Sequence, residues 1–182
     1  MLPACSSHKR FQRRFQKEVR MKKVDNDGYI LCVLQASVFE NSVERIHSSS
    51  PIFIRRFMNS SIAKQLDNTS ILETNVQPND ILDLLNEEYG VSSYGSVKYT
   101  RNEMYWIGYV YRYFALAYDF SSSQIYRIVK PQELRNVFLP YHTMDPAQAI
   151  ERILEAKGLS FEQDEAQELK RQYEIYKRIR QA

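Results

Sequence analysis

The chain has 182 residues, which is long enough for one domain with a sizeable core, and a formal net charge of +3. Only five glycines and six prolines, against nine phenylalanines and thirteen tyrosines, argue against a turn-rich β-sandwich and favour an all-α protein. The two cysteines, Cys5 and Cys32, lack the spacing of a zinc site or a disulfide framework, and no apolar run suits a signal peptide or a membrane helix. We therefore expect a cytoplasmic protein without a membrane partner.

The positive charge is concentrated in residues 1–23, which hold eight Lys or Arg and one Glu. The other 159 residues hold 17 Lys or Arg and 21 Asp or Glu, so the remainder is mildly acidic. Residues 1–23 are predicted to form a flexible basic arm, either a dispensable leader or an arm that binds nucleic acid. In the second case the candidate phosphate contacts are Arg10, Arg13, Arg14 and Lys17.

A helical core domain is expected over residues 24–158, and its first helix over 29–46. Apolar residues recur there at helical spacing, which predicts the buried face. The predicted buried stripe is Ile30, Val33, Leu34 and Val38, with Val43 as a further candidate.

A second helix is expected to begin at Ser50, with Pro51 in its first turn. Its apolar residues form one stripe, and its polar residues form an exposed face with Arg55 at the border. The predicted buried residues are Ile54, Met58, Ile62 and Leu66, and the exposed ones Arg56, Asn59, Ser60 and Lys64.

A connection over 69–78 leads to a short helix that is predicted to be capped by Asn79 or Asp80 and to stop at Gly90. Residues 91–99 are expected to form a loop.

The segment 102–120, "NEMYWIGYVYRYFALAYDF", is crowded with aromatic residues. Thr100 and Glu103 form a capping box before it, so it is predicted to be a helix, and Gly108 indicates a close crossing by another helix. A membrane span, a base-stacking platform and a cofactor box are less favoured, because Arg112 interrupts the apolar run, no other basic residue lies in the segment, and it holds no His or Cys. Because the helix is apolar on nearly every side, it is expected at the centre of a compact bundle of about six to eight helices.

Arg112 lies in the middle of this aromatic helix. Its guanidinium could reach solvent, pair with a buried carboxylate, or line a polar pocket where an acid of a partner docks. Pairing within the fold is favoured over the other two arrangements.

Two short helices follow, the first opened by Ser121 and Gln124 as a second capping box and the next by Pro131 after a break at Lys130. Segment 121–139 could form a helix-turn-helix, with Arg127 and Arg135 as contacts to nucleic acid. Asp145 and Pro146 begin another helix, which is predicted to bury one apolar stripe. A final segment follows it. That stripe is Ala149, Ile150, Ile153 and Leu154, and residues 159–182 are predicted to be an amphipathic helix capped by Ser160.

The sequence contains no nucleotide-binding, zinc-protease or serine-hydrolase motif. His142 and Asp145 could be a catalytic pair, but Asp145 is better explained as the helix cap. No catalytic residue, metal site or cofactor is predicted, and an enzyme of unrecognised type is left as a minor alternative.

The stretches "SPIFIRRFMNSSIAKQLD", "YILCVLQASVFE" and the segment from "EEYGVSSYG" to "AIERILEAK" resemble small bacterial proteins of toxin–antitoxin-like gene pairs, labelled as antitoxin components. The resemblance covers about residues 24–157. It implies a non-catalytic protein that binds and restrains a cognate toxin-like partner. The alternative hypothesis is a DNA-binding regulator of its own operon. The candidate partner interface is Arg55, Arg56, Asn59, Lys64, Tyr109 and Arg112.

Overall fold

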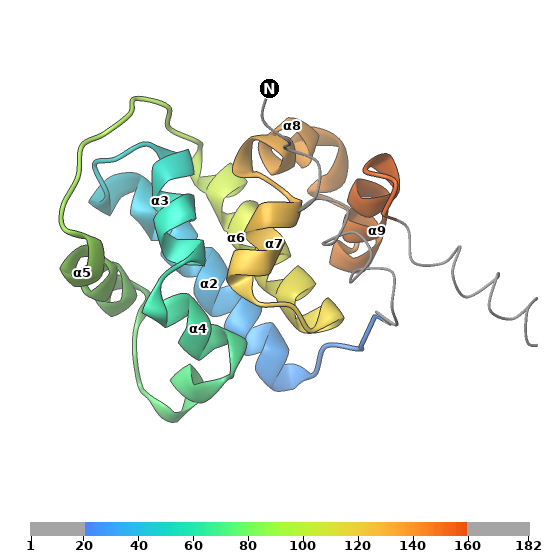
Figure 1. The fold of residues 1–182 in the computed structure, drawn as a ribbon, viewed down its shortest axis with the longest axis horizontal. Helices are drawn as coiled ribbons and strands as arrows, with labels where there is room; N and C mark the ends of the chain where they lie inside the picture. Colours follow the sequence, from blue (N-terminus) through green and yellow to red (C-terminus); the bar gives the residue numbers. More distant parts are fainter. Residues whose placement is uncertain (1–20, 160–182) are drawn as a thin grey trace, which may run out of the picture. The chain divides into compact units, whose positions relative to one another are not determined.

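The computed structural model describes residues 21–159, and the regular secondary structure of these residues is helical, without a strand (Figure 1). This confirms the predicted all-α, multi-helix fold. Eight α-helices and one 3-10 helix, η1, follow in order. They are α2 (Asn26–Arg45), α3 (Ser50–Met58), α4 (Ser61–Asp67), η1 (Ser70–Glu73), α5 (Pro78–Tyr89), α6 (Arg101–Tyr118), α7 (Ser122–Ile128), α8 (Pro131–Tyr141) and α9 (Pro146–Ala156).

The chain divides into two compact units, one of residues 22–150 and one of residues 1–21 with 151–182. Every site described below belongs to the first unit. The predicted arm over 1–23 and terminal helix over 159–182, with its cap at Ser160, fall almost wholly outside the described residues and stay predictions.

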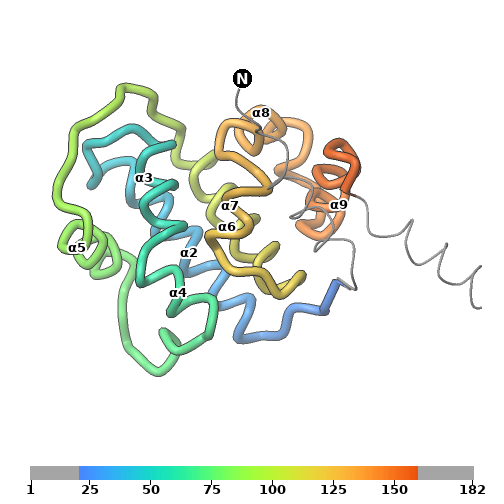
Figure 2. Tube along the Cα trace, in the orientation of Figure 1, coloured from blue at the N-terminus to red at the C-terminus, as the bar shows by residue number. Residues whose placement is uncertain are grey.

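Helices α2 and α6 form the central pair of the 22–150 unit (Figure 2). Helix α5 packs against α2, and α7 and α8 pack against α6. A Cβ added at Gly108 would lie 2.9 Å from Cγ of Phe39 and 3.0 Å from both Cα of Ala36 and the carbonyl oxygen of Gln35. Gly108 therefore lets the backbone of α2 approach α6 closely, as the sequence predicted, and α6 is the central aromatic helix.

The predicted buried face of the first helix is wrong in part. Ile30 and Val33 were expected in the core, but they are 56% and 46% exposed. Apolar residues surround most of α2, so spacing alone could not select its inner face; the close approach to α6 selects it. The residues of α2 that are buried are Gly28, Leu31, Cys32, Gln35, Ala36, Val38, Phe39 and Ser42.

The predicted second helix is two helices, because the chain breaks between Met58 and Ser61. Ser60 adopts an extended conformation, and its Oγ accepts a hydrogen bond from the amide of Ala63 at 3.1 Å, so it caps α4. The predicted stripe nevertheless spans both helices and is buried at all four positions, Ile54, Met58, Ile62 and Leu66.

The start of α3 is held by the loop before α6 rather than by its own cap. Ser49, not Ser50, is the N-cap residue, and its side chain makes no capping bond. Instead the amide of Ser49 donates to the carbonyl of Tyr94 at 3.0 Å, and that of Ser50 to the carbonyl of Val97 at 2.9 Å. Residues 91–99 form a loop as predicted, and it satisfies helix donors that are distant in sequence.

Local capping signals were accurate elsewhere. The Glu103 carboxylate accepts from the amide of Thr100 at 2.7 Å, and Thr100 Oγ1 from the amide of Glu103 at 3.3 Å. The Ser121 and Gln124 box also forms, and Asp145 Oδ1 accepts from the amide of Ala147 at 2.9 Å. The cap of α5 was predicted wrongly. Gln77 is its N-cap residue, and Asp80 accepts from the amide of Gln77 at 2.9 Å as its box partner.

Candidate functional site

Arg112 is completely buried, and each nitrogen of its guanidinium donates a hydrogen bond. Nε donates to Gln35 Oε1 at 2.9 Å, Nη1 to Asp67 Oδ1 at 2.7 Å and Nη2 to Ser122 Oγ at 2.8 Å. The Gln35 amide in turn donates to the carbonyl of Gly108 at 3.1 Å. These bonds tie α2, α4, α6 and α7 together at one point.

Asp67 completes this buried cluster. Its Oδ2 accepts from the amide of Ser122 at 2.9 Å, and its Oδ1 from the Ser122 hydroxyl at 2.7 Å. Burial lowers the pKa of the Arg112 guanidinium, and the Asp67 carboxylate opposes that shift. Arg112 therefore pairs within the fold, as the favoured reading predicted. It was also named as an interface residue, which this conformation excludes because its side chain has no exposed surface.

The other predicted interface residues of α3 and α4 lie near the surface. Arg55 and Lys64 are exposed, whereas Arg56 is half-buried: Nη1 donates to the carbonyl of Gly90 at 3.0 Å, and its guanidinium lies 5.7 Å from the ring centre of Tyr89. The Asn59 amide donates to the carbonyl of Arg55 at 2.7 Å. This surface is polar, and two of its four predicted contacts already serve the fold.

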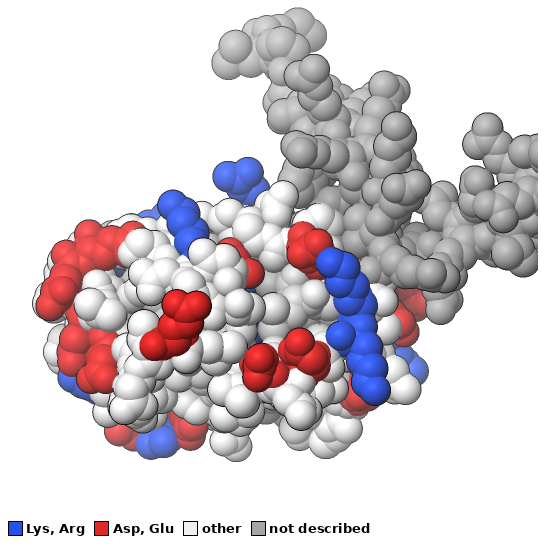
Figure 3. Space-filling model, turned by 90° about the horizontal axis from the view of Figure 1, so that it is seen from below, with Lys and Arg blue, Asp and Glu red and all other residues white. Residues whose placement is uncertain are grey.

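The predicted nucleic-acid contacts are only partly described. Arg10, Arg13, Arg14 and Lys17 lie outside residues 21–159. Arg127 is exposed on α7, but Arg135 donates to Glu103 Oε1 at 3.0 Å and lies 4.5 Å from the ring centre of Tyr99. Residues 21–159 hold 14 Lys or Arg and 16 Asp or Glu, and Figure 3 shows acidic side chains gathered over α5 at the left. Of the two predicted contacts on α7 and α8, Arg135 is paired within the fold and Arg127 is exposed.

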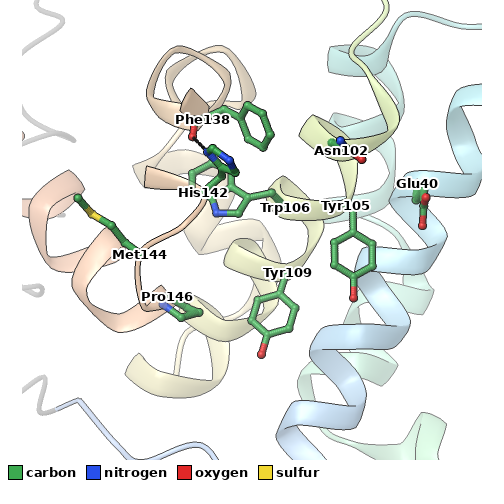
Figure 4. A pocket seen from close by; sticks show the side chains of 9 residues that line it. All are labelled: Glu40, Asn102, Tyr105, Trp106, Tyr109, Phe138, His142, Met144 and Pro146. Atoms are coloured by element: carbon green, nitrogen blue, oxygen red, sulfur yellow. Dashed lines mark hydrogen bonds between the residues drawn. The ribbon is translucent and has the colours of Figure 1, made fainter. Parts of the chain in front are cut away.

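An open cleft lies along the N-terminal half of α6, with a volume of about 460 Å³. Figure 4 shows Tyr105, Trp106 and Tyr109 projecting from α6, with side chains from α8 and the following turn on one side and from α2 on the other. The cleft has the size and aromatic lining of a ligand pocket. Its lining residues are Glu40, Asn102, Tyr105, Trp106, Tyr109, Phe138, His142, Met144 and Pro146.

The aromatic wall of this cleft is built by ring contacts: Trp106 meets Phe138 edge to face, and Phe138 stacks on His142. The ring centre of Phe138 lies 5.7 Å from that of Trp106 and 4.7 Å from that of His142. His142 Nδ1 lies 3.1 Å from the carbonyl of Phe138 and 3.0 Å from that of Leu139, so this nitrogen carries the proton. In the neutral ring Nε2 is then an acceptor.

Tyr109 is the one predicted interface residue that lines the cleft. It is half-buried, and burial raises the pKa of its hydroxyl to about 12, with smaller contributions from Cys32 and neighbouring tyrosines. Tyr109 therefore stays neutral and presents a ring and a hydroxyl rather than a charge.

The sequence reading missed Trp106, Phe138 and Met144 as site residues, because it assigned the aromatic helix to the core on every side. One signal was available. Asn102, Tyr105, Trp106 and Tyr109 are spaced by three and four residues, so they form a stripe that includes a polar amide. The other wall could not be predicted, since it depends on how α8 packs against α6.

The described helices contain no group of three or more His, Cys, Asp or Glu side chains that could hold a metal ion. Within residues 21–159 no helix is both long and apolar enough to span a membrane. No family model, curated protein or solved structure matches this chain. The resemblance to antitoxin components therefore stays a prediction.

Proposed function

We propose that this chain is an interaction protein of the antitoxin type, which binds a cognate partner protein and restrains it. The partner docks on the aromatic cleft of α6 and α8. The observation that carries this proposal is the cleft itself: tryptophan and tyrosine line an open surface, and these residues dominate the binding energy of protein interfaces.

The unused polar groups of the cleft support the same proposal. Among the described residues, the Trp106 indole N–H and the hydroxyls of Tyr105 and Tyr109 make no hydrogen bond to another part of the chain. A ligand or partner segment could therefore gain hydrogen bonds there without breaking any within the fold.

The experiment is co-expression of the full chain with the product of the neighbouring gene, followed by co-purification and by growth of the host. We expect the two proteins to purify together and the chain to relieve growth arrest caused by its partner. A neighbour that neither co-purifies nor arrests growth contradicts the antitoxin proposal.

Two variants locate the interface. Trp106→Ala removes the central ring and is expected to weaken partner binding by about 30-fold or more, the effect of losing a binding hot spot. The matched control is Tyr94→Ala, since Tyr94 is an aromatic residue that is 75% exposed on the loop before α6 and outside the cleft. Its binding should equal that of the wild type.

The predicted α3–α4 surface is the competing location. Charge reversal of Arg55 and Arg56 to glutamate is expected to leave partner binding at low salt unchanged if the cleft is the interface. Loss of binding in this double variant, with normal binding by Trp106→Ala, would move the interface to α3 and α4. Circular dichroism of each variant checks that it has folded.

A further inference from the structure

We propose that the aromatic cleft recognises a cationic side chain, specifically an arginine that the partner protein presents. This inference rests on the proposed function, because it assigns a chemistry to the same cleft. Three properties of the cleft favour an arginine side chain: the charge of the lining residues, the aromatic rings and the hydrogen-bond acceptors.

The charge of the cleft is the first observation. Its nine lining residues include one carboxylate, Glu40, and neither lysine nor arginine. Arg101 donates to Glu40 at 3.2 Å from Nε and at 3.0 Å from Nη2, and both bonds end on Oε1. Within the described chain Oε2 of Glu40 accepts no hydrogen bond, so the cleft keeps an acceptor for a second cation.

The rings are the second observation. A cation over an aromatic face is attracted by the ring quadrupole, and this fold already uses that attraction outside the cleft. The rings of Tyr105, Trp106 and Tyr109 hold no cation from residues 21–159. The three pairs elsewhere, with the distance from the cation to the ring centre, are Arg56 with Tyr89 at 5.7 Å, Lys130 with Tyr126 at 4.2 Å and Arg135 with Tyr99 at 4.5 Å.

The acceptors decide between arginine and lysine. A guanidinium is flat, stacks on rings and offers five donors, whereas an ammonium is compact and strongly hydrated. The cleft offers separated acceptors in Glu40 Oε2 and the Asn102 amide oxygen, and the tautomer of His142 with its proton on Nδ1 adds Nε2 as a third. Residues 102 to 109 span about 10 Å along α6, enough for an extended arginine side chain to lie against the rings.

The direct test uses short probes, and the chain supplies its own reporter, since Trp106 is the only tryptophan. An acetylated Gly-Arg-Gly amide is titrated into the full chain at low salt while tryptophan fluorescence is followed. The control probe replaces arginine by citrulline, which keeps the shape and removes the charge. We expect saturable binding of the arginine probe, about tenfold tighter than the citrulline probe. Equal responses to the two probes overturn the inference.

Substitution of Glu40 tests the carboxylate against a matched control. Glu40→Gln is expected to weaken binding of the arginine probe by about tenfold. Glu44→Gln removes the other partner of Arg101, but Glu44 does not line the cleft, so its affinity should stay within about twofold of wild type. Arg101→Gln should bind the probe more tightly, since Glu40 loses its competing cation. Equal effects of Glu40→Gln and Glu44→Gln contradict the proposal.

The outcomes separate this inference from the proposed function. Suppose that the partner binds and that Trp106→Ala abolishes this binding. If Glu40→Gln then binds the arginine probe as the wild type does, and the citrulline probe binds as tightly as the arginine probe, the cleft is an interface without cation selectivity. If the arginine probe binds selectively but no neighbouring protein does, the antitoxin proposal fails and the cation site stands.

Discussion

Two parts of the same helix behave in opposite ways. Toward the end of α6, Arg112 is buried and every nitrogen of its guanidinium is bonded within the fold. Toward the start, Tyr105, Trp106 and Tyr109 line an open cleft, and their polar atoms are unused by the described chain. Arginine, tyrosine and tryptophan are all favoured at interfaces, so residue type alone does not separate these two regions. The two regions differ in whether their polar side-chain atoms are already hydrogen-bonded within the fold.

The same contrast holds between Tyr109 and Tyr111, which are separated by one residue. The hydroxyl of Tyr111 is buried and donates to the carbonyl of Val129 at 2.9 Å, which joins α6 to the end of α7. Tyr109 lines the cleft, and its hydroxyl makes no hydrogen bond within the described chain. A polar group that is already paired supports the fold, and an unpaired one near the surface is free to bind.

The largest predicted effect is on the buried cluster. Asp67→Ala leaves Arg112 buried without its counter-charge and is expected to lower the free energy of unfolding by about 3–5 kcal/mol in urea denaturation. Asp83→Ala is the control, because Asp83 pairs with Arg45 on the surface at 2.9 Å; it should cost less than about 1 kcal/mol. Similar losses in the two variants would show that burial does not set the contribution of the Arg112–Asp67 pair.

Alkaline pH probes the same buried region through Cys32. Burial raises the pKa of its thiol to about 12 from 9.0, although the nearby Arg112 charge acts in the other direction. The unfolded thiol ionises near pH 9 while the folded one keeps its proton, so stability falls as pH rises from 9 to 12. We expect Cys32 to contribute a loss of about 2–3 kcal/mol between pH 7 and 11. Chemical denaturation of the wild type and Cys32→Ala across this range should show a shallower pH dependence in the variant; parallel curves contradict this.

Gly108→Ala tests the crossing of α2 and α6 that positions both regions. The added methyl group would meet backbone atoms of α2 at 3.0 Å, which cannot turn away as a side chain can. Overpacking of this kind costs about 1–3 kcal/mol of stability. This loss is expected to exceed the stability that alanine gains over glycine from its higher helix propensity. At Gly28 the nearest atoms belong to side chains, so Gly28→Ala should cost less in thermal or urea unfolding. The reverse order would place the close crossing elsewhere.

The smallest expected effects separate the two tyrosines. Tyr111→Phe leaves a buried carbonyl without its donor and should cost about 1–2 kcal/mol of stability. Tyr109→Phe removes a hydroxyl that has no bond within the described chain, so its stability should change by less than about 0.5 kcal/mol. Urea denaturation of both variants measures the difference. A loss at Tyr109 as large as that at Tyr111 would show that the cleft is part of the structural core.

Much of the helix pattern was predictable because its signals are local. The boxes at Thr100 and Ser121 and the Asp145–Pro146 start act within one turn, so they form whatever packs around them. The stripe from Ile54 to Leu66 was also correct, since the chain is amphipathic there. The role of Gly108 could be predicted for a related reason. Glycine destabilises the interior of a helix, so its presence there indicates that another helix crosses closely.

What the sequence by itself determined is therefore the class of fold, most helix starts and the place of α6 at the centre. Only the tertiary structure decided which face of α2 is buried, that Asp67 is the partner of Arg112, and that a cleft opens beside Trp106. Each of these depends on side chains that are distant in sequence: Asp67 is 45 residues from Arg112, and Phe138 is brought to Trp106 by the packing of α8 on α6. Spacing along one helix records which residues share a face, but the neighbouring helices determine whether that face is covered.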